Sequence, residues 1–332
     1  MLTESPSGLL CPTGGFHIDP WGPADKALIT HAHGDHARAG SRVYLCAEPC
    51  RELLQYRLGL DTPIETLPYG QPISIGDVRV SFHPAGHILG AAQIRIEGAG
   101  GVWVVAGDYK RASDPTCTPF EPVRCDTFVT ESTFGLPIYR WDPTETVVAD
   151  ILSWWQENAR EPRTSVLFCY TIGKAQRILA ELSRHTDRTI FVHGGMLPTI
   201  AAYREAGVAM LPVASVVEQA KGRKFAGELV LAPLSARGTT WMRRLGVHSD
   251  AFASGLMRVR GVRRQRAFDR GFVLSDHADW PALLDTIAET GASRAIATHG
   301  HAEPLARYLR ERGLDASVMR TAWEGEAASD ES

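Results

Sequence analysis

The segment from Thr30 to His36 constrains this chain more than any other stretch of its sequence. It follows the apolar run 27–29 and carries four potential metal ligands, namely His31, His33, Asp35 and His36. An apolar run that opens into a glycine is typical of a buried strand ending in a tight loop. Because side chains alternate along a strand, we expect His31 and His33 to point the same way. A turn at Gly34 lets Asp35 and His36 face the same pocket.

This donor set predicts a site for two divalent cations. Imidazole and carboxylate groups suit borderline metals, so we expect Zn²⁺ first and Mn²⁺ second. The alternative is a polar loop that is rich in histidine by chance. With 12 histidines among 332 residues, clustering beside an aspartate at this spacing favours the metal site.

Composition indicates a soluble globular chain of one large or two moderate domains. Hydrophobic residues make up 44% and charged residues 22%, and no apolar run approaches the roughly 20 residues of a membrane span. The first residues lack the basic start and apolar core of a signal peptide. Six cysteines without a CxxC pair fit a reducing compartment. We therefore expect a cytoplasmic protein without membrane association.

The net charge of −3 does not by itself indicate a nucleic-acid partner, but the charge is unevenly placed. Residues 324–332 form an acidic tail that we expect to be disordered. A run of arginines extends from Arg258 to Arg270. Such a stripe can bind phosphates on a chain that is acidic overall, or it can be a solvated face.

Apolar runs predict a strand-rich first half. We expect a helix at 49–57 and strands at 27–30, 43–46, 78–83, 93–96, 102–106 and 127–131. Few helices separate these strands, which favours stacked sheets. The segment 11–21 is interpreted as a turn-rich loop. Within it, Asp19 either orients the ligand loop from behind or simply forms a turn before Pro20.

After residue 141 strands and helices alternate, which predicts a parallel αβ segment inserted into the strand-rich part. We expect helices at 144–158, 173–184 and 199–206 and strands at 165–170 and 191–193. The earlier pattern resumes with a strand at 272–275, a helix from 281, a strand at 294–298 and a helix at 302–312. The predicted domains are 1–141 with 256–323, and the inserted domain 142–255.

Two further candidate ligands follow predicted strands. His87 comes after Gly86, where the backbone can approach a ligand closely, and is the expected third ligand of the metal held by His31 and His33. Asp108 ends another strand, and a carboxylate there can bridge two cations about 3.5–4 Å apart.

Three more polar residues end apolar runs, namely Glu131, His277 and His299. Each would be unremarkable alone. Converging strand ends that carry such groups make the rim of an active site.

These motifs resemble a known family. Four segments resemble the motifs of the metallo-β-lactamase fold. They are the segment from His31 to His36, Gly86-His87, Gly107-Asp108 and the terminal Thr-His-Gly. Glu131 in TESTFG, His277 in LSDHAD and His299 in THGH resemble the three additional motifs of the β-CASP nucleases. Nearly the whole chain is similar to the bacterial ligase-associated DNA exonucleases. The segments that carry this similarity include CPTGGFHIDPW, AGDYKR, TFGLPIYRW and IGKAQR.

The resemblance implies an α/β fold, a four-layer αββα sandwich with an inserted αβ β-CASP domain. It also implies the metal ligands: His31, His33 and His87 for the first metal, Asp35, His36 and His299 for the second, and Asp108 between them. Glu131 would orient His277. We expect His277 to be the general acid, because its pKa lies near the working pH; an ordinary strand-end histidine is the alternative. Asp35 belongs to the same catalytic set.

The implied function is that of a two-metal phosphodiesterase, a DNA exonuclease in repair that associates with a DNA ligase or helicase. His299 favours RNA instead, because crosslink-repair relatives that process DNA tend to lack it. A small-molecule hydrolase would need neither the inserted segment nor His277. A non-catalytic binding module would not need a complete ligand set.

Substrate phosphates could bind at a predicted helix start that carries Thr171, Gly173, Lys174 and Arg177. Free N–H groups at such a start favour anions. Lys110 follows Asp108 closely and is a further candidate. The alternative for the helix start is an ordinary solvated basic face.

Overall fold

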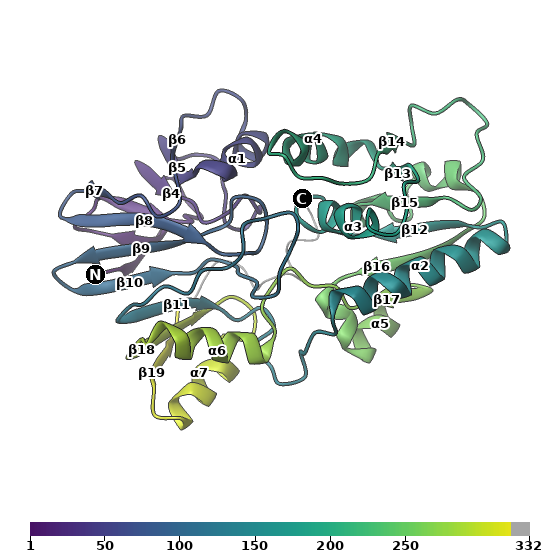
Figure 1. The fold of residues 1–332 in the computed structure, drawn as a ribbon. Coiled ribbons are helices and arrows are strands. Elements are labelled where there is room, and N and C mark those ends of the chain that lie inside the picture. Colours follow the sequence, from purple (N-terminus) through teal and green to yellow (C-terminus); the bar gives the residue numbers. More distant parts are fainter. Residues whose placement is uncertain (320–332) are drawn as a thin grey trace. The chain divides into compact units, whose positions relative to one another are not determined.

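The structure is a computed structural model that describes residues 1–319, and of Arg263 it describes only the backbone. The predicted acidic tail lies outside these residues. The chain divides into two compact units (Figure 1). The discontinuous unit comprises Met1–Tyr139 and the chain from His277 onward, and the inserted unit is Arg140–Asp276. Among residues 1–319, no helix is both long and apolar enough to cross a membrane.

The discontinuous unit contains two sheets (Figure 1). The first has the order β1-β2-β3-β4-β5-β6, with β1 (Thr3–Ser5), β2 (Gly8–Cys11), β3 (Phe16–Ile18), β4 (Lys26–Leu28), β5 (Val43–Ala47) and β6 (Ile64–Leu67). The second has the order β19-β18-β11-β10-β9-β8-β7, with β7 (Ile73–Ile75), β8 (Val78–Pro84), β9 (Ala92–Gly98), β10 (Gly101–Val105), β11 (Thr127–Glu131), β18 (Arg294–Thr298) and β19 (Asp315–Val318). Its helices are α1 (Arg51–Leu58), α6 (Trp280–Thr290) and α7 (Ala302–Glu311).

The two sheets share one apolar core. Phe16, Ile18 and Leu28 come from the first sheet, and Phe82 and Ile94 come from the second. All are at most 2% exposed, so each contributes roughly 1.5–3 kcal/mol of hydrophobic stabilisation. Packing of this kind holds the strand ends of both sheets in fixed positions.

The segment 11–21 differs from its prediction as a turn-rich loop. It contains the end of β2 and all of β3, joined by a turn in which the N–H of Gly15 donates to the carbonyl of Cys11. Phe16 and Ile18 flank His17 in the alternation of a half-buried strand. Three residues are too few for that alternation to be recognised among prolines and glycines.

The inserted unit contains one sheet in which every neighbouring pair of strands is parallel. Its order is β14-β13-β15-β12-β16-β17, with β12 (Thr164–Phe168), β13 (Ile190–Val192), β14 (Val213–Ser215), β15 (Leu229–Ala232), β16 (His248–Ala253) and β17 (Arg270–Phe272). Its helices are α2 (Thr144–Arg160), α3 (Lys174–Leu182), α4 (Leu197–Glu205) and α5 (Arg260–Arg266). Short 3₁₀ helices complete the two units, namely η1 (Glu48–Cys50), η2 (Gly194–Met196), η3 (Leu234–Ala236), η4 (Thr240–Leu245) and η5 (Gly255–Arg258).

The inserted unit extends further than predicted. The prediction ended it at residue 255 and placed a strand of the other domain at 272–275. The structure instead has β17 paired with β16 in the parallel sheet, so the unit continues to Asp276. The sequence around residue 272 is an apolar run that fits either domain equally well.

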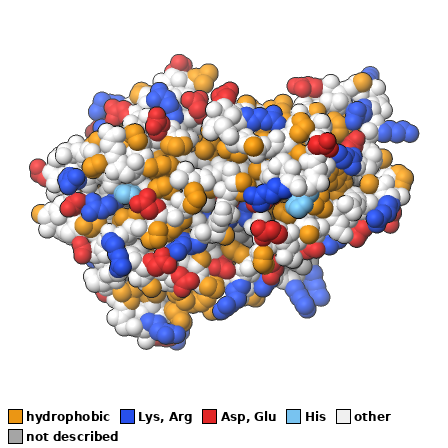
Figure 2. Space-filling view, viewed as in Figure 1, with side chains coloured by type: hydrophobic (Ala, Val, Ile, Leu, Met, Phe, Trp, Pro, Cys, Tyr) orange, Lys and Arg blue, Asp and Glu red, His pale blue; other side chains and the backbone are white. Residues whose placement is uncertain are grey.

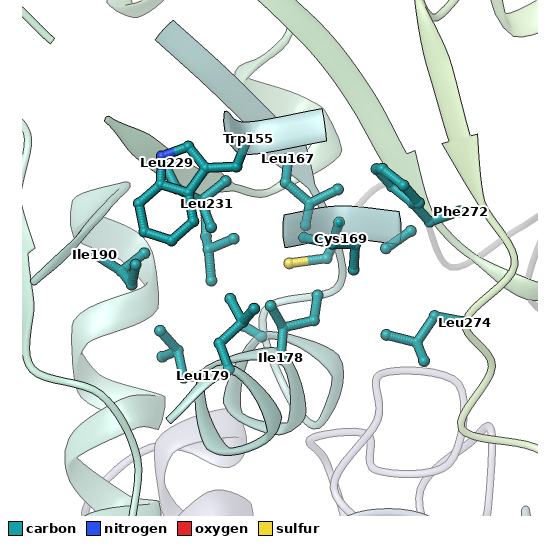
Figure 3. Close-up of a cluster of buried hydrophobic side chains, with 14 of the residues drawn as sticks. Trp155, Leu167, Cys169, Ile178, Leu179, Ile190, Leu229, Leu231, Phe272 and Leu274 are labelled. Atoms are coloured by element: carbon teal, nitrogen blue, oxygen red, sulfur yellow. The ribbon is translucent and has the colours of Figure 1, made fainter. Parts of the chain in front are cut away.

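Both faces of the parallel sheet are buried. Leu167 belongs to one apolar cluster, and its neighbours Val166 and Phe168 belong to another on the opposite face. Figure 3 shows Ile178 and Leu179 of α3 directed at Leu167 and the strands beside it. Alternate side chains of a strand point to opposite faces, so a strand buried on both sides reads as a continuous apolar run.

Candidate metal centre and catalytic site

The predicted ligand loop begins directly after β4. The N–H of Ile29 still donates to Leu45 of the neighbouring strand, and the N–H groups of His36 and Ala37 close a turn on the carbonyl of His33. β4 ends at Leu28, two residues before the predicted end at Thr30, so the ligand loop begins slightly earlier than expected. The turn brings both halves of the loop to one place.

The first donor cluster comprises His31, His33, His87 and Asp108, whose potential ligand atoms all lie within 4.8 Å of one another. His33 Nδ1 and His87 Nε2 are 3.0 Å apart. Asp108 Oδ2 lies 3.4 Å from His31 Nε2 and 3.8 Å from His87 Nε2. Tetrahedral zinc with Zn–N bonds of about 2.1 Å has ligand–ligand separations of about 3.4 Å. The cluster has the size that such an ion requires.

The second cluster comprises Asp35, His36 and His299. His36 Nε2 lies 3.8 Å from Asp35 Oδ2 and 3.5 Å from Asp108 Oδ1. The two oxygens of Asp108 thus face different clusters. Asp108 therefore lies between the two clusters, and its bridging of two cations stays a prediction.

Two buried nitrogens support a metal site independently of the distances. Nε2 of His31 and Nε2 of His36 are buried and have no hydrogen-bond partner within residues 1–319. A buried polar atom without a partner costs about 1–3 kcal/mol. A cation at each nitrogen would remove that cost, so the residues fit the implied metals.

Asp19 holds ligands of both clusters from behind. Its Oδ2 accepts hydrogen bonds from His36 Nδ1 at 2.8 Å and from Thr30 Oγ1 at 2.6 Å. Thr30 Oγ1 in turn lies 3.1 Å from His31 Nδ1. Because the Nδ1 atoms are occupied as donors, Nε2 is the nitrogen of each ring that a metal would bind. Thr30 was missed by sequence reasoning, which gave no signal beyond its place directly before the first ligand.

Replacing Asp19 by asparagine is expected to weaken metal binding by about 10- to 100-fold, because an amide has only one acceptor atom. It cannot accept from the N–H of Thr30 in place of Oδ1 and also from Thr30 Oγ1 and His36 Nδ1 in place of Oδ2. Competition with a chromogenic chelator measures this affinity. Asp25→Asn is the matched control, since Asp25 is an exposed residue of the same unit paired only loosely with Arg42. Equal affinities for the two variants would contradict the bracing role of Asp19.

Charges in the two clusters shift the pKa of their groups in opposite directions. Burial, reinforced by the charge of His36, lowers the pKa of His31 well below its usual value. Burial and the charge of His277 do the same to the pKa of His87. For His36, burial is outweighed by the carboxylates of Asp108 and Asp35, which raise its pKa well above the usual value.

Asp108 is held as a carboxylate. Burial opposes its ionisation, but the charges of His36 and His277 prevail and keep the pKa of Asp108 well below its usual value. A carboxylate with a lowered pKa between two donor clusters suits the binding of cations.

Glu131 and His277 form a buried pair. His277 Nδ1 lies 2.9 Å from Glu131 Oε2, and Glu131 Oε1 accepts from the N–H of Tyr109 at 2.7 Å. Burial raises the pKa of Glu131, while the charge of His277 opposes that rise. The pair adjoins Asp108, whose Oδ2 lies 3.9 Å from His277 Nδ1. A carboxylate that accepts from Nδ1 fixes the tautomer and the orientation of the ring.

Gly107 permits the close approach of Asp108 to the ligand loop. Its φ is +58°, and a Cβ at this position would lie 2.6 Å from the side chain of Thr30. Gly107→Ala is therefore expected to lower the free energy of unfolding by about 3 kcal/mol. Gly70→Ala is the control for strain alone, because φ is +75° there and no atom lies within 4 Å. Chemical denaturation of the metal-free protein should show the larger loss for Gly107→Ala.

The residues predicted to bind substrate phosphate are not brought to one open site. Lys110 is 2% exposed, and its Nζ lies 3.0 Å from Asp114 Oδ2. Lys174 and Arg177 are 1% and 3% exposed, and both contact Asp276.

The predicted helix start is already capped. The N–H of Gly173 donates to Gln176 Oε1 at 2.8 Å, and the Gln176 amide donates back to the carbonyl of Thr171 at 3.0 Å. An internal cap of this kind replaces the anion that an uncapped helix start would attract. The side chain of Gln176 gave no such signal in the sequence.

Basic side chains do not gather into one field on the face seen in Figure 2, where acidic and basic groups are interspersed. In the predicted arginine stripe, Arg258 lies 3.1 Å from Asp142 and Arg270 lies 3.6 Å from Glu157. Both pairs are partly exposed. The stripe is therefore partly neutralised by neighbouring acids.

Fold and site together define an α/β protein with clusters of buried histidine and aspartate side chains that could bind metal at its strand ends. No family model matches the chain. It is 32% identical over 315 residues to a probable DNA ligase of Opitutus terrae, an alignment that covers 93% of this chain and 30% of that protein.

Other relatives are named as ribonucleases. The chain is 25% identical over 209 residues to an RNase J-like protein of Methanocaldococcus jannaschii, covering 54% of this chain and 49% of that protein. It is 26% identical over 221 residues to a ribonuclease of Thermus thermophilus, covering 58% and 49%. The chain thus spans half or less of the length of these relatives. Their names support, at a coarse level, a relationship to nucleases.

One solved structure has the same fold over most of the chain. A protein of unknown function from Enterococcus faecalis V583 superposes with a TM-score of 0.60 at 13% identity, covering 91% of this chain and 80% of that one. At this identity the likeness concerns the fold alone.

Proposed function

We propose that the chain is a two-metal phosphodiesterase that hydrolyses nucleic acid, with DNA as the favoured substrate in a repair reaction. The observation that carries the proposal is the position of Asp108. One carboxylate faces two donor clusters and the Glu131–His277 pair. A site for two cations beside a proton donor is what phosphodiester hydrolysis requires.

The proposed fold is the four-layer αββα metallo-β-lactamase sandwich, with the inserted unit as its β-CASP domain. The shared core of the two sheets, the parallel sheet of the inserted unit and the motifs named above support this assignment. In this assignment the β-CASP domain is Arg140–Asp276.

His31, His33 and His87 would hold one metal, and Asp35, His36 and His299 the other, with Asp108 shared. Zn²⁺ is the expected metal and Mn²⁺ the alternative. Two such cations, when bound, supply a hydroxide nucleophile at neutral pH and offset the charge of the phosphoryl oxygens.

The side chains contribute the remaining steps. Asp108 and Asp35 place negative charge where cations must be retained. His277 donates a proton from Nε2 to the leaving sugar oxygen, while Glu131 holds Nδ1 and stabilises the protonated ring. Proton donation by a positioned histidine contributes about 10²- to 10⁴-fold in rate.

Metal binding is expected to release about one proton at neutral pH and to strengthen as pH rises. The reason is the raised pKa of His36, which keeps its ring protonated in the metal-free protein. Titration calorimetry with Zn²⁺ in two buffers of different ionisation enthalpy measures the release. A binding enthalpy that is the same in both buffers would contradict this assignment of His36 as a ligand.

RNA is the second candidate substrate. The ribonuclease names of the archaeal and Thermus relatives favour it, as does the histidine at position 299. The similarity along nearly the whole chain to a probable DNA ligase favours DNA. That relative also suggests a DNA ligase as a functional partner, and a cytoplasmic location accords with such a role.

The deciding experiment incubates the metal-loaded protein with matched single-stranded DNA and RNA, each labelled at either end, beside a His31→Ala control. Stepwise shortening of DNA that the control lacks would support the proposed exonuclease and give its polarity. Preferential cleavage of RNA would favour the second candidate. Absence of metal-dependent cleavage of both would reject the nuclease function.

A further inference from the structure

The chain returns from the inserted unit to the discontinuous unit next to the proposed proton donor. Asp276 is the last residue of the inserted unit, and His277 is the first residue of the discontinuous unit. Contacts that fix Asp276 therefore also restrict the backbone from which the imidazole of His277 extends.

Two cations of α3 hold the side chain of Asp276. Lys174 Nζ lies 3.2 Å from Asp276 Oδ2, and Arg177 Nη1 lies 3.2 Å from Oδ1. Asp276, like both cations, is at most 3% exposed. A buried carboxylate with one cation at each oxygen is held in a single orientation.

Arg177 also holds the backbone before His277. Its Nη1 donates to the carbonyl of Ser275 at 2.6 Å, and its Nη2 donates to Thr144 Oγ1 at 2.8 Å. A planar guanidinium that binds a carbonyl and a carboxylate together fixes both more strictly than a single ammonium group does.

The chain is anchored again directly after His277. The N–H of Ala278 donates to the carbonyl of Tyr109 at 2.7 Å, and Asp279 caps α6 by accepting from the N–H of Ala282 at 3.0 Å. The imidazole itself is held by Glu131. His277 thus lies between two anchored residues. Side chains of α3 hold the residue before it, whereas Tyr109 holds the residue after it.

We propose that Lys174 and Arg177 are positioning residues for His277, acting through Asp276 rather than through a substrate phosphate. The inference rests on the proposed nuclease function. It replaces the phosphate-binding role that the sequence suggested for this helix start. A displacement of about 1 Å in a catalytic group can cost on the order of 10²-fold in rate.

The test uses Lys174→Met and Arg177→Met in the full chain loaded with Zn²⁺ or Mn²⁺. Each variant removes one of the two cations that contact Asp276. The substrates are a DNA oligonucleotide, whose sugar oxygen needs a proton to leave, and bis(p-nitrophenyl) phosphate, whose phenolate does not. We expect kcat on DNA to fall about 10- to 100-fold with KM unchanged, and kcat on the aryl diester to change less than about threefold. Lys174→Arg, which retains the charge, should restore most of the activity on DNA.

Arg184→Met is the matched control. Arg184 lies 2.6 Å from the buried carboxylate of Glu181 near the other end of α3, and its removal should leave both activities unchanged. Equal losses on both substrates in Lys174→Met would overturn the proposal. So would an increase in KM for DNA at constant kcat, which would restore the phosphate-binding role.

A second measurement does not depend on activity. The ring nitrogens of His277 are observed by NMR in protein labelled with ¹⁵N-histidine and assigned by loss of the signal in His277→Gln. The signal should shift in Lys174→Met and Arg177→Met but not in Arg184→Met, and an unshifted signal would overturn the proposal. A wild-type protein that cleaves neither substrate would reject the nuclease function alone, because the NMR comparison would still test the positioning.

Discussion

Replacing Asp108 with alanine is expected to reduce cleavage of nucleic acid by at least about 10⁴-fold, the largest effect of any single substitution in this chain. The two oxygens of Asp108 lie 3.4 Å from His31 Nε2 and 3.5 Å from His36 Nε2. Removing the carboxylate therefore weakens both metal sites at once. The substitution also leaves the buried Nε2 atoms of His31 and His36 without the negative charge of Asp108 beside them.

Metal content and activity should be measured together for Asp108→Ala. We expect fewer than two metal ions per chain after dialysis. Asp315→Ala is the control, because Asp315 is an exposed carboxylate of the same unit, 3.7 Å from Arg294. Retention of two metals with activity within about tenfold of the wild type would exclude a bridging role for Asp108.

Replacing His277 with alanine is expected to lower kcat by about 10²- to 10⁴-fold while leaving metal content unchanged. A general acid must carry its proton to act, so the wild-type kcat should decline towards alkaline pH. The variant should lack that decline. The kcat–pH profile on DNA, measured beside metal analysis, separates a proton donor from a ligand.

His83→Ala is the matched control for His277→Ala. His83 lies in β8, where its ring contacts Ser81 and Glu121 and belongs to neither donor cluster. Its removal should leave kcat and the pH profile unchanged. Loss of a metal ion in His277→Ala would show instead that His277 is a ligand, since its ring also lies near Asp108.

The donor residues could be proposed from the sequence because they lie at the end of an apolar run or in the loop directly after one. Side chains alternate along a strand, so the directions of the two or three residues at its end follow from the local sequence. This local pattern is enough to identify His31 and His33 as candidates. The same reasoning recognised Asp108 and His299, although nearly 200 positions separate them along the chain. The sequence pattern indicates which residue types stand at the ends of the strands. The apolar core shared by the two sheets then brings these strand ends together.

The roles of the lysines and arginines could not be predicted in the same way. Lys110 looks like a phosphate ligand because it follows Asp108 closely, and Lys174 because it stands at a predicted helix start. In the structure each of them contacts an aspartate instead. Whether a cation faces solvent or a buried carboxylate depends on long-range packing that leaves no local pattern. The end of the inserted unit was missed for a related reason, since one three-residue strand decides it.

The donor set is divided by the inserted unit. Asp108 and Glu131 precede Arg140, whereas His277 and His299 follow Asp276, and β18 completes the second sheet only by pairing with β11 across this gap. During synthesis, a ribosome must therefore translate the whole inserted unit before the last ligands emerge. A nascent chain that stops before His299 carries an incomplete centre, so the order of synthesis itself delays any hydrolytic activity until His299 has been translated.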